Sequence, residues 1–129
     1  MNNTFSLLGR IGLSLIFIIS GLGKIAAYAG TQQYMESAGI PGALLPLVIA
    51  LELGGGLAVM SGFLSRWVAL AMAAFSFVSA AMFHNHFADP AQAINFWKNV
   101  AMTGGFLLLA ANGAGAYSID GWLSRRRGA

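Results

Sequence analysis

The 129-residue sequence contains no cysteine and very few charged residues. Without a thiolate, the chain itself cannot carry out thiol–disulfide exchange, hold an iron–sulfur cluster on cysteines or form a cysteine zinc site. Charged residues make up 9% of the chain and hydrophobic residues 57%, whereas an ordinary soluble domain carries about 25% charged residues. So few charges cannot cover the surface of a soluble domain of this length. We therefore expect lipid to cover most of the molecule.

The sequence also lacks the basic surface typical of nucleic-acid-binding proteins. The formal net charge is +3, but three of the seven basic residues form the tail run Arg125, Arg126 and Arg127. The other basic residues are scattered singly. Because a basic run after a hydrophobic segment is a topology signal in membrane proteins, we expect no nucleic-acid partner.

Four hydrophobic segments, each close to the ~20 residues that a spanning helix needs, divide the chain. They cover about residues 7–27, 43–64, 67–86 and 97–117. The connections are short, with residues 28–39 and 85–95 on one side and little more than Ser65 and Arg66 on the other. The sequence therefore predicts an all-α integral membrane protein: a single domain, an antiparallel bundle of four transmembrane helices with a short basic C-terminal tail.

The first segment has an alternative interpretation, because Ala27, Tyr28 and Ala29 resemble the cleavage site of a signal peptide. A basic region before the apolar run is barely present, however, and Lys24 interrupts the approach to this site. We interpret the segment as a membrane helix. Arg10 and Lys24 lie near its ends, where long basic side chains are expected to extend toward the lipid headgroups.

Glu52 lies close to the midpoint of the second span, where an ionised carboxylate costs several kcal/mol unless it is paired or neutral. It should therefore face the interior of the bundle. With a rise of 1.5 Å per residue, Lys24 lies about 7 Å further toward the outside than Glu52, and Arg10 about 13 Å further toward the inside. Lys24 is therefore the expected partner of Glu52.

Other polar residues cluster toward the same, outer end of the bundle. Ser20 lies one turn before Lys24, and Asn99 and Thr103 form a similar strip on the fourth span beside Lys98. These residues are expected to line an outward-opening polar pocket. On a functional interpretation, the pocket would exchange protons or bind a polar head group. On a structural interpretation, its polar groups would only fix helix packing through an ion pair and hydrogen bonds.

Two histidines, His84 and His86, follow the apolar part of the third span and would lie at the rim of this pocket. Residues two apart on a helix point to different sides, so the two side chains cannot both bind one metal ion while the helix continues. The sequence has no further histidine to act as a facing haem ligand. We predict no metal site and treat these histidines as titratable groups at the interface.

Several sequence strings, read together, resemble those of the DoxX family of small bacterial inner-membrane proteins. They are SGLGKI at 20–25, YMESAGIP at 34–41, ELGGGLA at 52–58, GFLSR at 62–66, FWKN at 96–99, GGFLLLA at 104–110 and GAYSID at 115–120. The resemblance covers nearly the whole chain. It implies a multi-pass protein of the bacterial inner (plasma) membrane that is associated with respiratory or redox complexes, because relatives are named as quinol-oxidase or thiosulfate–quinone oxidoreductase subunits, or as membrane partners of oxidative-stress enzymes.

The positions that match the family motifs overlap the polar residues selected above on physical grounds. These positions are Arg10, Lys24, Glu52, Arg66, His84, Lys98 and Asn99. We hypothesise that Glu52 and Lys24 form the catalytic pair. The residues expected to bind a cofactor, for which a quinone is the candidate, are His84, Lys98, Asn99 and Ser20.

The leading hypothesis is a membrane subunit that binds a quinone or similar amphiphile and acts in a redox system whose redox centre belongs to a protein partner. No self-contained catalytic motif is present. One alternative is a non-catalytic scaffold or assembly factor in the membrane. Another is a small solute or proton carrier that works as a homo-oligomer through Glu52 and Lys24, although no internal repeat of the kind found in many transporters is evident.

The basic residues are distributed unevenly across the predicted spans. Arg10, Arg66 and the three tail arginines fall on the side of both termini, whereas Lys24 and Lys98 fall on the other side. Because cytoplasmic loops carry an excess of lysine and arginine, both termini are predicted to be cytoplasmic.

This topology can be tested with single cysteines, since the chain has none of its own. In intact spheroplasts, an impermeant thiol reagent should label Ser37→Cys and Ala91→Cys but leave Ala129→Cys unlabelled until the membrane is permeabilised. Labelling of Ala129→Cys alone would invert the orientation.

Overall fold

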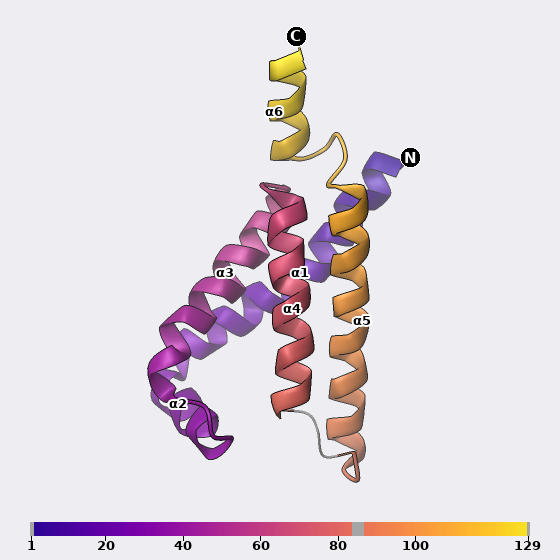
Figure 1. Ribbon diagram of the computed structural model, residues 1–129. Coiled ribbons are helices and arrows are strands. Elements are labelled where there is room, and N and C mark those ends of the chain that lie inside the picture. The colour runs from indigo at the N-terminus through magenta and orange to yellow at the C-terminus, as the bar shows by residue number, and fades with distance from the viewer. Residues whose placement is uncertain (1, 84–86, 129) are drawn as a thin grey trace.

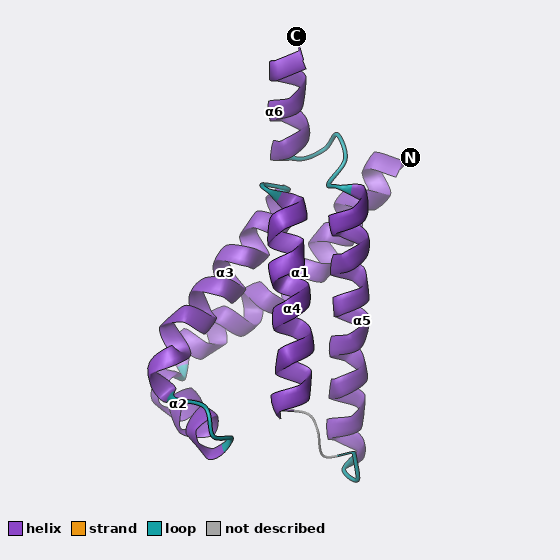
Figure 2. Cartoon of the chain, viewed as in Figure 1, coloured by secondary structure: helices purple, strands orange, loops and turns teal. Residues whose placement is uncertain are grey.

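The computed structural model describes residues 2–83 and 87–128, which form helices and connecting loops without any strand (Figure 2). The long helices are α1 (Asn2–Ala26), α3 (Leu45–Ser61), α4 (Ser65–Phe83) and α5 (Pro90–Asn112). The shorter ones are α2 (Tyr28–Ser37), the 3₁₀ helix η1 (Gly42–Leu44) and α6 (Ile119–Gly128).

The long helices associate as two pairs. Helix α1 packs along α3, and α4 packs along α5, while contacts between α3 and α4 join the two pairs. Figure 1 shows that consecutive long helices run in opposite directions and that both ends of the chain lie at the same end of the molecule. Helix α6 projects beyond the long helices at that end, and α2 lies at the opposite end.

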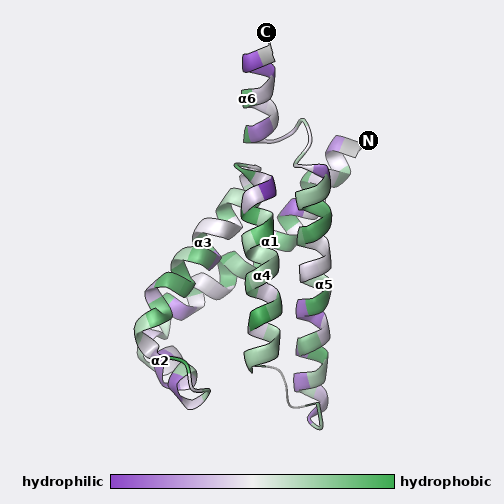
Figure 3. Cartoon of the chain, viewed as in Figure 1, coloured by the Kyte–Doolittle hydropathy of each residue, from purple (hydrophilic) through white to green (hydrophobic). Residues whose placement is uncertain are grey.

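The outside of the molecule is apolar. Three segments are long and apolar enough to cross a membrane, namely Asn3–Ala26, Gly42–Ser61 and Ser65–Phe83. Figure 3 shows the apolar residues along these helices, and Ile19, Leu47 and Leu108 each leave 66% of their surface exposed. Helix α5 is long enough but is not among the three, because polar residues interrupt its first half. Lipid is the natural cover for such a surface.

The predicted boundaries differ from the observed ones mainly at the ends. The connection expected over residues 28–39 contains α2, and the basic tail forms α6. The fourth segment is a helix over Pro90–Asn112 rather than 97–117, because Asp89 caps its start by accepting a hydrogen bond from Ala91 N at 3.0 Å. Helix α4 is described as far as Phe83, and the predicted end of the third span at residue 86 lies outside the described residues.

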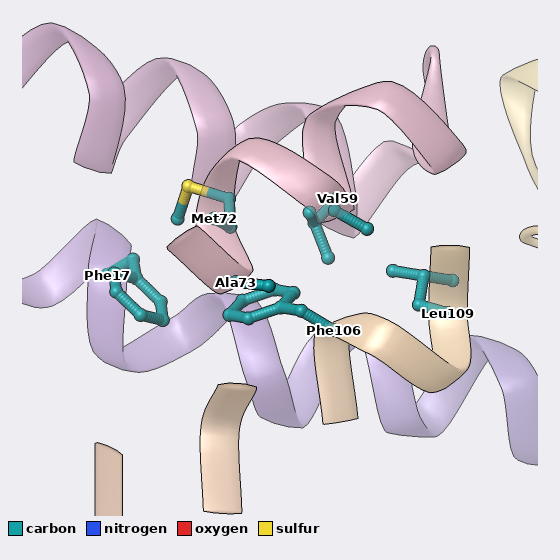
Figure 4. Close-up of a cluster of buried hydrophobic side chains, with 7 residues drawn as sticks. Phe17, Val59, Met72, Ala73, Phe106 and Leu109 are labelled. Atoms are coloured by element: carbon teal, nitrogen blue, oxygen red, sulfur yellow. The ribbon is translucent and has the colours of Figure 1, made fainter. Parts of the chain in front are cut away.

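The main hydrophobic core lies where the two helix pairs meet (Figure 4). Its buried members are Phe17, Val59, Ala69, Met72, Ala73, Phe106 and Leu109. The ring of Phe17 on α1 lies 5.5 Å from that of Phe106 on α5, so this contact bridges the two pairs. A smaller cluster of Met35, Ile40 and Leu45 holds α2 against the start of α3.

Glycine residues allow α1 and α3 to approach closely. A Cβ atom at Gly21 would lie 2.7 Å from Leu53 Cγ, and one at Gly56 would lie 2.9 Å from Ile18 Cγ1. Small residues therefore serve helix contact at these two positions. A Cβ atom at Gly23, by contrast, would meet open space.

Arg10 is buried and does not extend toward the headgroups, so that expectation is wrong. Its Nη1 donates to the carbonyls of Val59 at 3.3 Å and Met60 at 2.8 Å, and its Nη2 donates to the carbonyl of Tyr117. The carbonyls in the last turn of α3 have no partner within their own helix, and the helix dipole favours a cation there. Arg10 thereby ties α1 both to the end of α3 and to the segment between α5 and α6.

Asp120 holds the turn between α3 and α4. Its carboxylate accepts hydrogen bonds from the backbone N–H groups of Leu64 and Ser65, each at 2.8 Å, and its own N–H donates to Gly62 O at 2.9 Å. Leu64 needs this support because its φ of 49° is unfavourable for a residue with a side chain. Burial alone would raise the pKa of Asp120, but hydrogen bonds from Ser65 and Leu64 and the charge of Arg10 lower this pKa below its usual value.

This arrangement predicts that Asp120→Ala destabilises the protein more than Asp89→Ala. Each variant loses a helix cap worth about 1 kcal/mol, but only Asp120 also joins α6 to the α3–α4 turn. Thermal unfolding in detergent at pH 7 measures the difference, and equal losses would contradict the role of Asp120.

Because the pKa of Asp120 is lowered by folding, its contribution to stability is present at neutral pH and is lost on acidification below about pH 4. Acid should therefore destabilise the wild type more than Asp120→Ala.

Candidate functional site

A buried ion pair joins α1 to α3 toward the end of the molecule where α2 lies. Lys24 Nζ lies 2.8 Å from Glu52 Oε1 and also donates a hydrogen bond to Ser20 Oγ at 2.7 Å. The predicted pairing of Lys24 with Glu52 is therefore confirmed. The side chain of Glu52 is only 3% exposed, whereas that of Lys24 is 28% exposed. The cation therefore presents part of its surface beside a carboxylate that is almost completely enclosed.

A cavity of about 440 Å³ lies beside this ion pair. Such a volume is in the range of about 300–1,000 Å³ that is typical of small-molecule sites. Polar residues enter its wall from both helix pairs: Ser20, Lys24 and Glu52 from α1 and α3, and Ser76 and Asn99 from α4 and α5. The remaining wall is mostly apolar, with Phe17 and Phe75 among its aromatic residues. The cavity is thus a largely apolar space with polar groups from opposite pairs of helices.

Helix α2 completes the wall through Thr31, Tyr34 and Met35. The ring of Tyr34 is stacked on that of Phe83, with centroids 5.4 Å apart and planes inclined by 19°. This contact connects α2 to the end of α4. The buried side chain of Met35 anchors α2 against the start of α3. The segment after the first span is therefore part of the candidate site and not only a connection.

The wall formed by α4 and α5 has hydrogen-bonding capacity of its own. Asn99 Nδ2 donates to the backbone carbonyl of Ser76 at 3.2 Å, and Thr103 Oγ1 donates to the carbonyl of Asn99 at 2.8 Å. Ser76 is 1% exposed, and its hydroxyl oxygen has no hydrogen-bond partner in the described part of the chain. Ser79 of α4 also lines the cavity, so a ligand would find one amide and two hydroxyl groups on this wall.

The structure brings most of the predicted site residues to one cavity, namely Ser20, Lys24, Glu52 and Asn99. Lys98 is exposed and does not line the cavity, because one residue along a helix corresponds to a turn of about 100° away from Asn99. His84 lies outside the described residues, as does His86. The functional roles assigned to these residues remain predictions.

The sequence analysis did not anticipate that Ser76 and Arg10 are buried. Ser76 could have been noticed as a hydroxyl in the middle of an apolar span. Arg10 could have been placed inside by periodicity, because Arg10, Ser14, Phe17 and Lys24 follow the spacing of one helix face and the first three are buried. The missed information was therefore the direction of each side chain around its helix, and not its depth.

An all-helical molecule with an apolar exterior and an enclosed ion pair beside a cavity is a multi-pass membrane protein with a candidate ligand site. The DoxX family model matches residues 5–85, and the chain belongs to this family. The matched segment includes the Lys24–Glu52 pair and Ser76.

Relatives of known name agree on the compartment. The chain is 53% identical to inner membrane protein YqjF of Escherichia coli (strain K12) over 93% of its length and 92% of the relative. It is 39% identical to inner membrane protein YphA of the same organism, over 88% and 86%. A Bacillus subtilis (strain 168) protein named "Putative oxidoreductase CatD" is 36% identical over 57% of each chain. No solved structure matches the chain. The protein is therefore a multi-pass protein of the inner membrane.

The ion pair predicts a specific pattern of stability changes. Lys24→Met or Glu52→Leu alone should lower the free energy of unfolding by about 3–5 kcal/mol, because each leaves a buried charge without its partner. The double variant should be more stable than either single variant, since two apolar groups have no charge to solvate. Thermal unfolding in detergent measures this, with the exposed Lys98→Met as control for the loss of one lysine. Additive losses would show that the two side chains are not coupled.

Proposed function

We propose that this protein is a membrane subunit that binds the polar head of a quinone-like amphiphile beside Lys24 and Glu52 and acts within a redox system. The observation that carries the proposal is the partly exposed Lys24 ammonium at the wall of a ligand-sized, mostly apolar cavity. An intramembrane ionisable residue is a functional candidate by default, because its burial is expensive. The name of the Bacillus subtilis relative supports the redox part of the proposal.

The position of the cavity suits a molecule with an apolar tail. Ile16, Val78 and Met82 line the cavity, and about half of the surface of each residue is accessible (51%, 51% and 47%). We infer that the cavity opens beside these residues toward the surface that lipid covers. A ligand could place its head at the polar wall while its tail remains among lipid chains.

The residue types suit the chemistry of a quinone head. Its two carbonyl oxygens need hydrogen-bond donors, which Lys24 and Asn99 provide. Reduction of a quinone to the quinol consumes two electrons and two protons. Glu52 would carry one of these protons: its carboxylate would accept it when the quinol is oxidised and return it when the quinone is reduced, while the other proton would exchange with water. The electrons would come from the redox centre of a protein partner, and this chain has no cysteine that could hold an iron–sulfur cluster of its own.

The proposal includes α5 as a fourth span, with both termini in the cytoplasm. Helix α5 packs along α4, one of the apolar candidate spans, and its polar residue Asn99 faces Ser76 of α4. Internal pairing of this kind lets a less apolar helix cross the bilayer. The cavity would then open in the outer half of the membrane.

Purification from native membranes in mild detergent tests the function. Mass spectrometry should find a bound quinone and a partner protein with a flavin, haem or metal centre in the wild type. Asn99→Leu should lose the quinone. Glu52→Gln should fold normally but abolish redox-linked activity with the partner, because it keeps the size of the side chain while removing its charge.

The matched control is Glu36→Gln, which makes the same change at an exposed position of α2 outside the cavity wall. This control should keep both the quinone and the activity. If the wild type carries no quinone and Glu52→Gln is fully active in cells, the site has no such function. A ligand-free protein with a partner would then indicate a scaffold, and a ligand-free homo-oligomer a carrier.

A further inference from the structure

The hydrogen-bonding groups of the ion pair are only partly used within the protein. A lysine ammonium has three N–H donors, and Lys24 uses one toward Glu52 and one toward Ser20. The third remains for a group in the cavity, since Lys24 lines the cavity and is 28% exposed. On Glu52, Oε1 is paired with Lys24, and the carboxylate also lines the cavity, where its remaining acceptor capacity is available to a ligand. The ion pair thus presents a charged donor and a charged acceptor side by side.

We propose that the group recognised at this pair is a ring hydroxyl, so that the site binds the reduced, hydroquinone form of its ligand more tightly than the oxidised quinone. This inference rests on the proposed function and specifies its ligand. A hydroxyl donates its hydrogen to Glu52 Oε2 and accepts a hydrogen bond from Lys24 Nζ at the same time. A quinone carbonyl can only accept, so it leaves the buried carboxylate oxygen without a donor.

The size of the preference follows from the acceptor of Glu52 that a bound quinone would leave without a donor. A buried acceptor without a partner loses its hydration and gains nothing in return, and the loss is larger for a charged group than for a neutral one. Sites built to hydrogen-bond a hydroxyl therefore reject analogues that lack it. A preference of about tenfold or more for the hydroquinone is expected.

The opposite wall does not discriminate between the two forms. Asn99 uses one amide hydrogen toward the carbonyl of Ser76, which leaves one N–H donor and its carbonyl oxygen for a ligand. The Ser76 hydroxyl can likewise donate or accept. A hydroxyl and a carbonyl are equally acceptable there, so the preference must come from the Lys24–Glu52 side of the cavity.

Three probes with the same decyl tail and ring isolate the hydroxyl: a decyl benzohydroquinone, its benzoquinone and its dimethyl ether. Their dissociation constants are measured by equilibrium dialysis with purified wild type in detergent, under anaerobic conditions so that the hydroquinone is not oxidised. The hydroquinone should bind about tenfold or more tightly than both other probes. The dimethyl ether controls for the ring oxygens, because it retains them without a hydrogen to donate.

Glu52→Gln should bring the affinity for the hydroquinone close to that for the quinone, since a neutral amide is a weaker acceptor. Glu36→Gln should keep the full preference. The double variant Lys24→Met/Glu52→Leu provides a second test that does not depend on the folding of Glu52→Gln, and it should bind all three probes with similar affinity.

The possible failures separate the two proposals. If the quinone binds as tightly as the hydroquinone, or more tightly, the hydroxyl preference is wrong while amphiphile binding stands. If the preference persists in Glu52→Gln, Glu52 is not its origin and the inference is wrong. If none of the three probes binds to folded wild type, both the inference and the proposed function are wrong.

Discussion

A charge inside the hydrocarbon of a bilayer must find its partner within the protein, because lipid offers no hydrogen bonds and no counter-charge. Two cations of α1 are subject to this constraint, and both find a partner on α3. Lys24 pairs with Glu52, while Arg10 binds the carbonyls at the end of α3. The two residues are about 21 Å apart along the helix axis. Together they fix the register of α1 against α3 at both ends, and glycines allow the close approach between them.

The position of the cavity follows from how the two helix pairs meet. Around Phe17, Met72 and Phe106 the pairs are closely packed, and at the end that holds both termini Asp120 joins α6 to the α3–α4 turn. Toward α2 the two pairs leave a space, whose wall α2 completes with its own side chains. The core is dense at one level of the molecule and the space is open at another level. The ion pair therefore lies beside a ligand-sized cavity and not inside a packed core.

Stability alone is a weak reason for keeping an ion pair at this level. A buried pair often contributes little compared with well-packed apolar residues of the same volume, because the cost of removing two charges from water offsets their attraction. The third N–H donor of Lys24 and the remaining acceptor capacity of the Glu52 carboxylate both need a hydrogen-bond partner in the cavity. Recognition of a ligand hydroxyl would satisfy both groups at once, which gives a physical reason for a charged pair at this cavity.

The sequence alone determined the class of protein and the depth of its charges. The shortage of charge required lipid, the apolar runs located the long helices, and counting residues at 1.5 Å each brought Lys24 to Glu52. The depth of a residue in the membrane can be estimated by counting residues, because a bilayer restricts the position of every spanning helix along the membrane normal. The short helices α2 and α6 were not predictable, since helices of this length depend on tertiary contacts.

Only the tertiary structure decided which direction each polar side chain faces. It buried Arg10, exposed Lys98 and directed its neighbour Asn99 into the cavity. Neighbours on a helix differ by about 100° in direction, so equal depth does not mean a shared site. That direction is set by how the helices pack against one another, and the packing is a property of the whole chain.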